Sequence, residues 1–415
     1  MAGFEIRPIT DPKDLLRHKK LCVYLYRAPN AGLADEDAVI RTAMEDRANA
    51  PEDDILLGAY EDGVLYSSLR LRPYTVNFDG HDVAMSGIGG VISDPAVQGK
   101  GAVKQLFAEA FRLMHEQGRA LSQLYPFDTW YYRQFGYDAC CGNTEWSIPV
   151  RQFRTTGEGR FRAFDNSPEM KNQIREIYAS FCRRFNMCVI RTESEWDQFF
   201  AKHDAYTSGL LSFVHETDGK ADAFMSVSTQ SYPDKALDFQ VPCLWFSSMT
   251  GLREIFAYFK TQIPFADRAL VTLPQGIDLS GIIGISDGWG KRNSRMKFGF
   301  TGLSRAVDVQ ALLAVAKVRH VAEGNVTIRI SGDSYCPWNN GVYTLSLEDP
   351  SRVTKAEDHG QECDIDLTPN TFVSLFFGRY DMDTCDMLPD VRVNGDRAKL
   401  SEIFYPKPCF IDARF

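Results

Sequence analysis

One segment near residue 100 restricts the fold of this chain more than any other. A strand pattern runs from Val83 to Ser93, Pro95 follows it, and a glycine-rich loop then leads directly into a helix pattern. The loop residues are Gln98, Gly99, Lys100, Gly101 and Ala102. The helix pattern repeats apolar residues at intervals of three and four, which indicates one buried face. These residues are Val103, Leu106, Phe107, Ala110, Phe111 and Met114. The succession of strand, turn and amphipathic helix predicts an α+β fold of mixed α/β layers.

The glycine-rich loop has the residue types of an anion site. Glycine lets a ligand approach the backbone closely, and the first N–H groups of a helix are unpaired at its positive dipole end. Strand, glycine turn and helix start therefore predict a pyrophosphate site, to which Lys100 would add a charge. A plain strand-to-helix loop is the alternative that these residues leave open.

The composition is that of a soluble globular protein with an acidic balance. Of the 415 residues, 44% are hydrophobic and 24% are charged, and the formal net charge is -9. An acidic surface disfavours nucleic acid and anionic membranes as partners, and it suits a cationic substrate. No apolar stretch is long enough to span a bilayer, and the N-terminal residues lack the apolar run of a signal peptide. These features predict a cytoplasmic protein.

The ten cysteines are scattered along the chain, and none forms a Cys-x-x-Cys pair. His-Glu-x-x-His is also absent, so the spacings typical of zinc ligands are missing and no metal site is predicted. Buried, reduced thiols are the expectation for such a protein. The seven histidines lie outside any Ser/His/Asp or Cys/His pattern, which predicts satisfied or exposed imidazoles.

A chain of 415 residues is expected to form two or three domains. After residue 150 the helix and strand patterns restart. Leu244–Ser248 and the helix pattern behind it echo the segment near residue 100 without its glycine turn, which suggests an internal duplication. Later, a helix over Val307–Arg319, a strand over Val326–Ile330 and a hairpin at Asn339–Gly341 predict a small α+β layer. The apolar C-terminal end is expected to be docked.

A second segment, Tyr131-Tyr132-Arg133-Gln134-Phe135-Gly136-Tyr137, follows a strand pattern over Ala120–Tyr125. An aromatic core turn is the simplest interpretation of these residues. On the residues alone, this is the favoured interpretation.

Gln-x-x-Gly at residues 98–101 resembles the acetyl-CoA signature of the GNAT superfamily, (Arg/Gln)-x-x-Gly-x-(Gly/Ala). Tyr-x-x-Phe-Gly-Tyr, at this distance behind the turn, is also a feature of that superfamily. The chain departs from the signature at its last position, where Val103 stands. Over its full length the chain resembles the enhanced intracellular survival (Eis) N-acetyltransferases. Besides the two motifs, Trp338-Asn339 and the terminal Phe415 support this resemblance.

The resemblance implies three domains. These are a catalytic GNAT domain that binds acyl-CoA over residues 1–150, a degenerate GNAT domain over 151–300, and a sterol-carrier-protein-like domain over 301–415. It implies direct transfer of an acetyl group from acetyl-CoA, within a ternary complex, to a primary amine of an aminoglycoside, a polyamine or a lysine side chain. It also implies a homohexamer.

The resemblance assigns the parts of the site. The diphosphate of acetyl-CoA would lie on residues 98–102, and the strand before them would offer backbone groups to the pantetheine arm through Val91, Ile92 and Ser93. Tyr132 would be the general acid that protonates the leaving thiolate. The α-carboxylate of Phe415 would be the general base. A carboxylate with a pKa of about 3.5 is a weak base in water, so desolvation or a bridging water would have to assist it.

Two other functions compete with this interpretation. The chain could be a non-catalytic acyl-CoA or lipid-binding protein, or a peptide N-acyltransferase that uses a longer acyl chain. Retention of both Tyr132 and an apolar C-terminal end argues against binding alone. The third domain and the closer motif match favour acetyl transfer over transfer of a longer chain.

Overall fold

The computed structural model describes residues 3–26, 33, 35–155, 157–203, 210–232, 235–260, 266–284, 293–320 and 322–413. The chain divides into two compact units. The first combines Met1–Cys140, Gly302–Pro406 and Ala413–Phe415, and the second combines Cys141–Thr301 and Lys407–Asp412. Each unit is therefore built from segments far apart in the sequence. The chain leaves the first unit at Cys140, before the domain boundary expected at residue 150.

A six-stranded sheet forms the N-terminal part of the first unit. Its strands follow the order β1 (Glu5–Pro8), β2 (Ile55–Glu61), β3 (Val64–Phe78), β4 (His81–Ser93), β5 (Leu121–Leu124) and β13 (Leu303–Ala306). β1 to β4 are antiparallel neighbours, β4 and β5 are parallel, and β13 pairs antiparallel with β5. The last strand therefore comes from residues that follow most of the second unit in sequence.

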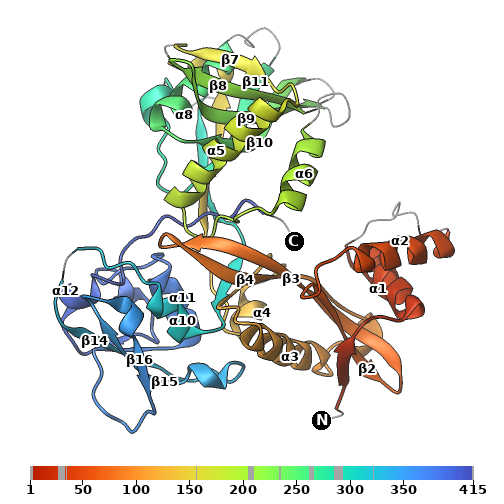
Figure 1. Cartoon of the computed structure of the whole chain (residues 1–415), viewed down its shortest axis with the longest axis vertical. Coiled ribbons are helices and arrows are strands. Elements are labelled where there is room, and N and C mark those ends of the chain that lie inside the picture. Colours follow the sequence, from red (N-terminus) through yellow and green to blue (C-terminus); the bar gives the residue numbers. More distant parts are fainter. Residues whose placement is uncertain are drawn as a thin grey trace. The chain divides into compact units, whose positions relative to one another are not determined.

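The helices of this part are α1 (Pro12–Leu25), α2 (Glu36–Ala48), α3 (Ala102–Glu116) and α4 (Thr129–Arg133), with a 3-10 turn η1 (Pro95–Val97) (Figure 1). Asp11 and Asp35 cap α1 and α2, because their carboxylates accept hydrogen bonds from backbone N–H groups in the first turn. The predicted apolar face of α3 is buried against β2, β3 and β4, except that Val103 is only partly buried. Full burial of one such side chain contributes about 1.5–3 kcal/mol, so this face fixes the helix behind the glycine turn.

The second unit contains a seven-stranded sheet. Its order is β12 (Arg295–Phe300), β6 (Gly142–Pro149), β11 (Ala266–Pro274), β10 (Lys235–Phe246), β9 (Lys220–Tyr232), β8 (Leu211–Thr217) and β7 (Arg160–Ala163). β10 and β11 are parallel and are joined through α8 (Met249–Ile255) and α9 (Ala257–Lys260), just as α3 joins the parallel β4 and β5. The repeated order supports the internal duplication. Helix α8 begins after Ser248, and no glycine turn precedes it.

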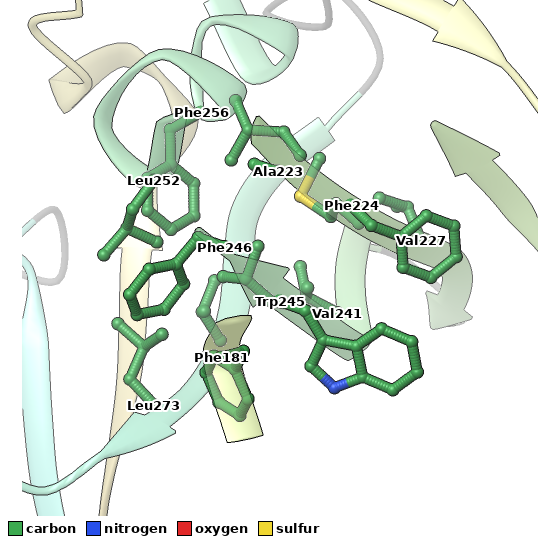
Figure 2. Close-up of a cluster of buried hydrophobic side chains, with 14 of the residues drawn as sticks. Phe181, Ala223, Phe224, Val227, Val241, Trp245, Phe246, Leu252, Phe256 and Leu273 are labelled. Atoms are coloured by element: carbon green, nitrogen blue, oxygen red, sulfur yellow. The ribbon is translucent and has the colours of Figure 1, made fainter. Parts of the chain in front are cut away.

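One large apolar core holds the second unit together. Helices α5 (Pro168–Arg184) and α8 both contact β9 and β10, and α6 (Glu193–Lys202) adds Trp196, Phe199 and Phe200 to the same cluster. Figure 2 shows Phe181 of α5 and Leu252 of α8 around side chains of β9, β10 and β11. The second sheet therefore has a helix-covered core equivalent to that of the first.

The C-terminal segment of the chain is docked on the second unit over its described residues, as its apolar character predicted. Backbone hydrogen bonds join Asn186 to Pro408 and Phe410, each at 2.8 Å. The Phe410 ring lies 5.9 Å from that of Phe181, and Ile411 is buried.

A third, five-stranded sheet belongs to the C-terminal part of the first unit. Its order is β16 (Thr354–Ala356), β15 (Gly341–Ser346), β14 (Asn325–Ile330), β17 (Ile365–Leu367) and β18 (Arg392–Val393). Its helices are α10 (Val309–Ala314), α11 (Pro369–Phe376) and α12 (Arg397–Leu400). Short 3-10 turns in the chain are η2 (Val150–Gln152), η3 (Ser280–Ile282), η4 (Pro337–Asn339), η5 (Pro350–Arg352) and η6 (Cys385–Met387).

Two sequence predictions for this part are wrong in detail. The helix predicted over Val307–Arg319 covers only Val309–Ala314, because Val307 extends the β13–β5 pairing to the Ala120 carbonyl and Asp308 caps the helix. The tight hairpin predicted at Asn339–Gly341 is a longer connection between β14 and β15. Asn339 Oδ1 accepts a hydrogen bond from the Val309 N–H at the start of α10 at 3.0 Å, and Asn340 bonds to the Asp333 backbone within the connection.

A buried ion pair links β13 to the C-terminal sheet region. Arg305 of β13 is fully buried and donates from Nη2 to both carboxylate oxygens of Asp333, at 2.6 and 2.8 Å. Its guanidinium also lies 4.8 Å from the Phe111 ring centroid. A Cβ added to Gly136, whose φ is +82°, would lie 1.8 Å from Arg305 Nη1. The glycine between Phe135 and Tyr137 is therefore required both by its backbone conformation and by this guanidinium.

Replacing Asp333 with alanine is expected to lower the free energy of unfolding by about 3–5 kcal/mol, because it leaves the buried Arg305 charge unpaired. Urea unfolding followed by circular dichroism measures the loss. Asp349→Ala is the control, because Asp349 pairs with Arg352 at the surface and its loss should cost less than about 1 kcal/mol. Similar small losses in both variants would contradict a stabilising role for the buried pair.

Candidate active site

The glycine turn lies between η1 and α3, as the sequence predicted, and it is open. Gly99 and Gly101 have φ values of +87° and +89°, which favour glycine. A Cβ added to either residue would meet no atom within 4 Å. Gln98 and Lys100 are exposed, and Ala102 begins α3. The space beside the backbone fits a ligand that approaches closely.

The start of α3 is suited to an anion. Within the described part of the chain, no side chain caps the helix at Gly101, so its first N–H groups are available to a ligand at the positive end of the helix dipole. Lys100 Nζ lies 3.4 Å from Glu61 Oε2 in an exposed pair, and such a pair holds a side chain only weakly. The residues predicted for a diphosphate therefore fit one by backbone geometry and charge.

Strand β4 separates from β5 beside this turn. Their pairing covers only Met85 to Ile88 of β4, so the later residues of β4 do not continue the parallel ladder. The Asp94 N–H bonds to the Tyr66 carbonyl on β3 at 2.8 Å. Because backbone groups alternate sides along a strand, those of Val91 and Ser93 are directed towards the open edge. They are available to an extended ligand arm.

Ile92 differs from its two neighbours. Its carbonyl accepts a hydrogen bond from the Ser67 hydroxyl at 2.8 Å, so this group is directed to β3 and not to the open edge. Of the three strand residues predicted to offer backbone groups, Val91 and Ser93 have the suitable direction.

A bulge in β4 lies at the point of separation. Ser68 pairs with Ile92 and Arg70 with Gly89, so two residues of β4 oppose one of β3, and Gly90 there has a φ of +58°. His18 of α1 packs against this bulge, with Cε1 3.6 Å from the position of a Cβ on Gly90.

His18 is a buried histidine that the sequence did not single out. Its Nδ1 lies 2.9 Å from the Ser68 hydroxyl, and its Nε2 lies 3.6 Å from the Cys22 sulfur. Burial lowers its pKa to about 4, with help from the positive charges of Lys19 and Arg70. The imidazole is therefore neutral at pH 7. It connects α1 with β3 and with the bulge in β4.

Tyr132, the predicted general acid, lies in α4 within a group of aromatic rings and is only 3% exposed. The ring centroids nearest to it are those of Tyr131 at 5.2 Å, Phe127 at 5.4 Å and Phe107 at 6.1 Å. Burial raises the pKa of Tyr132 above its ordinary value, and the hydroxyls of Tyr131 and Tyr26 raise it further. The phenol therefore keeps its proton at neutral pH, as a proton donor must.

The C-terminal end approaches the same part of the first unit. The Tyr125 hydroxyl, directly after β5, donates a hydrogen bond to the Ala413 carbonyl. Phe415, the predicted general base, lies outside the described residues, which end at Ala413. The contact of Tyr125 fixes the chain two residues before its terminal carboxylate.

Other features lie apart from these residues. A hollow of about 590 Å³ in the second unit is lined by Trp146, Ile277 and Met296 among others, and by none of the predicted site residues. Among the described residues, no group of three or more His, Cys, Asp and Glu side chains could hold a metal ion. No helix in the described ranges has the length and apolar character needed to cross a membrane.

Comparisons with known families match the two parts of the first unit separately. Residues 6–140 match the acetyltransferase (GNAT) domain, and residues 309–411 match the sterol carrier protein domain. No curated protein sequence matches the chain. The chain therefore carries a GNAT acetyltransferase domain and a sterol carrier protein domain, which confirms the resemblance drawn from its motifs.

Solved structures share the fold over the whole chain. A probable N-acyltransferase from Enterococcus faecalis V583 has a TM-score of 0.79 and 18% identity, with 100% of both chains covered. A GCN5-related N-acetyltransferase from Anabaena variabilis has a TM-score of 0.80 and 16% identity, with 99% of this chain and 100% of the other covered. Eis1 from Mycobacterium abscessus has a TM-score of 0.77 and 16% identity, with the same coverage. At these identities the likeness concerns the fold.

The buried His18 predicts a pH dependence of stability. Its pKa is about 4 in the folded chain and about 6.5 when unfolded, so the unfolded state binds more protons between these values. Stability should therefore fall as the pH decreases from 6.5 to 4, by up to about 3 kcal/mol. His18→Gln should remove this part of the acid dependence in unfolding measurements at pH 7 and 4.5. His359→Gln, at an exposed site, should leave it unchanged. Full acid dependence in the first variant would contradict the assignment.

Proposed function

We propose that this acyltransferase, with its GNAT domain and sterol carrier protein domain, transfers an acetyl group from acetyl-CoA to a primary amine by direct transfer in a ternary complex. The observation that carries the proposal is the separation of β4 from β5 between an open glycine turn and a buried tyrosine. The turn suits a diphosphate, and the free edge of β4 suits the pantetheine arm. Acetyl-CoA would supply the acetyl thioester at this edge.

The reaction needs a neutral amine, because an ammonium group has no lone pair. The α-carboxylate of Phe415 is the proposed general base, acting directly or through a water molecule. Two residues span at most about 7 Å, so the Tyr125–Ala413 contact restricts that carboxylate to the region beyond β5. Exclusion of water there would raise the pKa of the carboxylate and make it a better base.

Tyr132 is the proposed general acid. As the C–S bond breaks, negative charge develops on sulfur, and the phenol donates its proton to that atom. Its raised pKa keeps the proton in place until the charge develops. Backbone N–H groups on the open edge of β4, such as that of Ser93, are suited to polarise the thioester carbonyl.

The acceptor expected from the resemblance is a cationic one, such as an aminoglycoside, a polyamine or a lysine side chain, and the net charge of -9 is compatible with it. We place the reaction in the cytoplasm, where the ten free thiols would remain reduced. Nucleic acid and membranes are not among the proposed partners. The binding-only function and transfer of a longer acyl chain remain the competing proposals.

Release of free CoA thiol from acetyl-CoA, with a panel of primary amines, tests the proposal. Tyr132→Phe is expected to lower kcat by about 10²- to 10⁴-fold, because the phenolic proton is lost. One residue added after Phe415 should lower kcat strongly, because the terminal carboxylate moves. Tyr131→Phe is the matched control, since it removes a neighbouring hydroxyl that affects only the pKa of Tyr132, and it should lower kcat far less than Tyr132→Phe.

The possible results separate the proposals. No thiol release with any amine would favour acyl-CoA or lipid binding. Full activity of the extended chain would remove Phe415 from the mechanism. A strong preference for myristoyl-CoA over acetyl-CoA would favour the longer-chain transferase.

A homo-oligomer, expected as a hexamer from the resemblance, is also proposed. Among the described strands β12 is the last of its sheet, and it supports this proposal because Met296, Phe298 and Phe300 alternate along one side and are 63%, 49% and 37% exposed. An exposed apolar edge strand is a surface on which another chain can pair or pack.

Phe298→Glu is expected to shift the protein to smaller assemblies, because it places a charge within this apolar row. Analytical ultracentrifugation measures the change. Lys297→Glu on the other side of the strand is the control and should keep the wild-type mass. An unchanged mass for Phe298→Glu would exclude β12 from the interface.

A further inference from the structure

Helix α11 of the sterol carrier protein domain packs on more than its own sheet. All residues from Thr371 to Phe376 are buried, so the helix has no solvent-facing side over this stretch. It contacts β17 of the third sheet and β13 of the first. The Phe376 ring also stacks on that of Phe78, which ends β3, at a centroid distance of 5.3 Å. Covering one sheet requires only one apolar face, so α11 has a second packing partner in the GNAT domain.

The first turn of α11 holds the tyrosine segment, which is the stretch of residues 131–137. Asn370 is the second residue of this helix, and its Nδ2 donates to the carbonyls of Arg133 at 3.0 Å and Tyr137 at 2.8 Å. Both N–H bonds of the amide are therefore used. Arg133 directly follows Tyr132 and ends α4. One side chain thus joins the end of this helix to the end of the tyrosine segment.

A buried carboxylate adds to this link. Asp138 directly follows the tyrosine segment and is 1% exposed. Its carboxylate accepts hydrogen bonds from the Ser374 hydroxyl of α11 at 2.9 Å and from Arg379 Nη1 at 3.1 Å. Arg133 Nη1 donates to the same carboxylate. Three side chains of the sterol carrier protein domain therefore hold the chain directly after Tyr132.

The Tyr132 hydroxyl has no hydrogen bond of its own among the residues that the structure describes. Aromatic rings surround the phenol, and their packing is less directional than a hydrogen bond. Helix α4 has only five residues, and so short a helix is not stable by itself. A proton donor must come within about 2.6–3.2 Å of the atom that it protonates. The position of this hydroxyl therefore depends on how the backbone around it is held.

We propose that Asn370 is a positioning residue for the general acid: by holding the backbone directly after Tyr132, it places the phenol at the sulfur of acetyl-CoA. This inference rests on the proposed acetyl transfer. It gives the sterol carrier protein domain a part in the reaction, as the support of Tyr132. Asn370 contacts the backbone of the tyrosine segment and acts only through Tyr132.

Asn370→Ala and Asn370→Asp test this role through thiol release from acetyl-CoA. Both remove the amide donor, and aspartate keeps the shape of the side chain, so a role in packing alone would spare Asn370→Asp. We expect kcat to fall by about 10- to 100-fold in both, because a small displacement of a catalytic group has an effect of this size. The KM for acetyl-CoA should stay unchanged. Asn370→Gln, which keeps an amide, should recover part of the loss.

Asn394→Ala is the matched control. The Asn394 amide also donates to a backbone carbonyl in this domain, that of Cys363 at 3.0 Å, and not to the tyrosine segment. This variant should have the kcat of the wild type.

A double-mutant cycle with Tyr132→Phe separates positioning from general damage to the fold. If Asn370 acts through the phenol, Asn370→Ala should change kcat by less than about twofold once residue 132 lacks its hydroxyl. A merely structural role would lower kcat equally in both backgrounds.

Hydrogen exchange of residues 131–137, measured by mass spectrometry, does not depend on catalysis. Exchange should be faster in Asn370→Ala than in the wild type, and unchanged in Asn394→Ala. If the wild type releases no thiol with any amine, the proposed acetyl transfer fails, whereas faster exchange still supports the hold on the tyrosine segment. Three results would overturn the inference. These are unchanged exchange in Asn370→Ala, an unchanged kcat in that variant, and an equal loss of kcat with and without the Tyr132 hydroxyl.

Discussion

The buried pair of Arg305 and Asp333 is the constraint on which the first unit depends. Removing a guanidinium from water is costly, and the bidentate carboxylate offsets that cost only if both residues keep their positions. Arg305 belongs to β13, which closes the first sheet, and Asp333 belongs to the connection between β14 and β15. The guanidinium also restricts residue 136 to glycine and packs on Phe111 of α3. One charge thus ties the first sheet, helix α3, the tyrosine segment and the sterol carrier protein domain into a single unit.

Local patterns predicted most elements of the fold, and long-range pairing accounts for the errors. The apolar repeat of α3 and the aspartate caps of α1 and α2 are properties of neighbouring residues, so they can be read from the sequence. The sequence pattern does not show which of the two sheets a given strand joins. β6 joins the second sheet and β13 the first because of partners more than a hundred residues away in the sequence. The shortened α10 has the same origin, since Val307 continues the pairing of β13.

The candidate site likewise has parts that the sequence predicted and parts that it did not. The glycine turn and the tyrosine segment are contiguous motifs, and both lie where the sequence placed them, on the first unit. His18 was passed over because its significance comes from Ser68 and from the bulge at Gly90, neither of which is near it in sequence. Its one local signal is weak: with Leu15 and Cys22 it follows the helical spacing of the buried side of α1.

The late arrival of β13 has a consequence during synthesis. Ribosomes add roughly 5–20 residues per second, so the interval between Leu124 of β5 and Leu303 of β13 lasts roughly 10–35 s. Throughout this time the outer edge of β5 has no partner from its own chain, and an unpaired strand edge is a template for association with other nascent chains. The second sheet, which needs only residues up to Phe300, is completed first. Translation therefore reverses the order of the two sheets: all strands of the second sheet are available before β13 can complete the first.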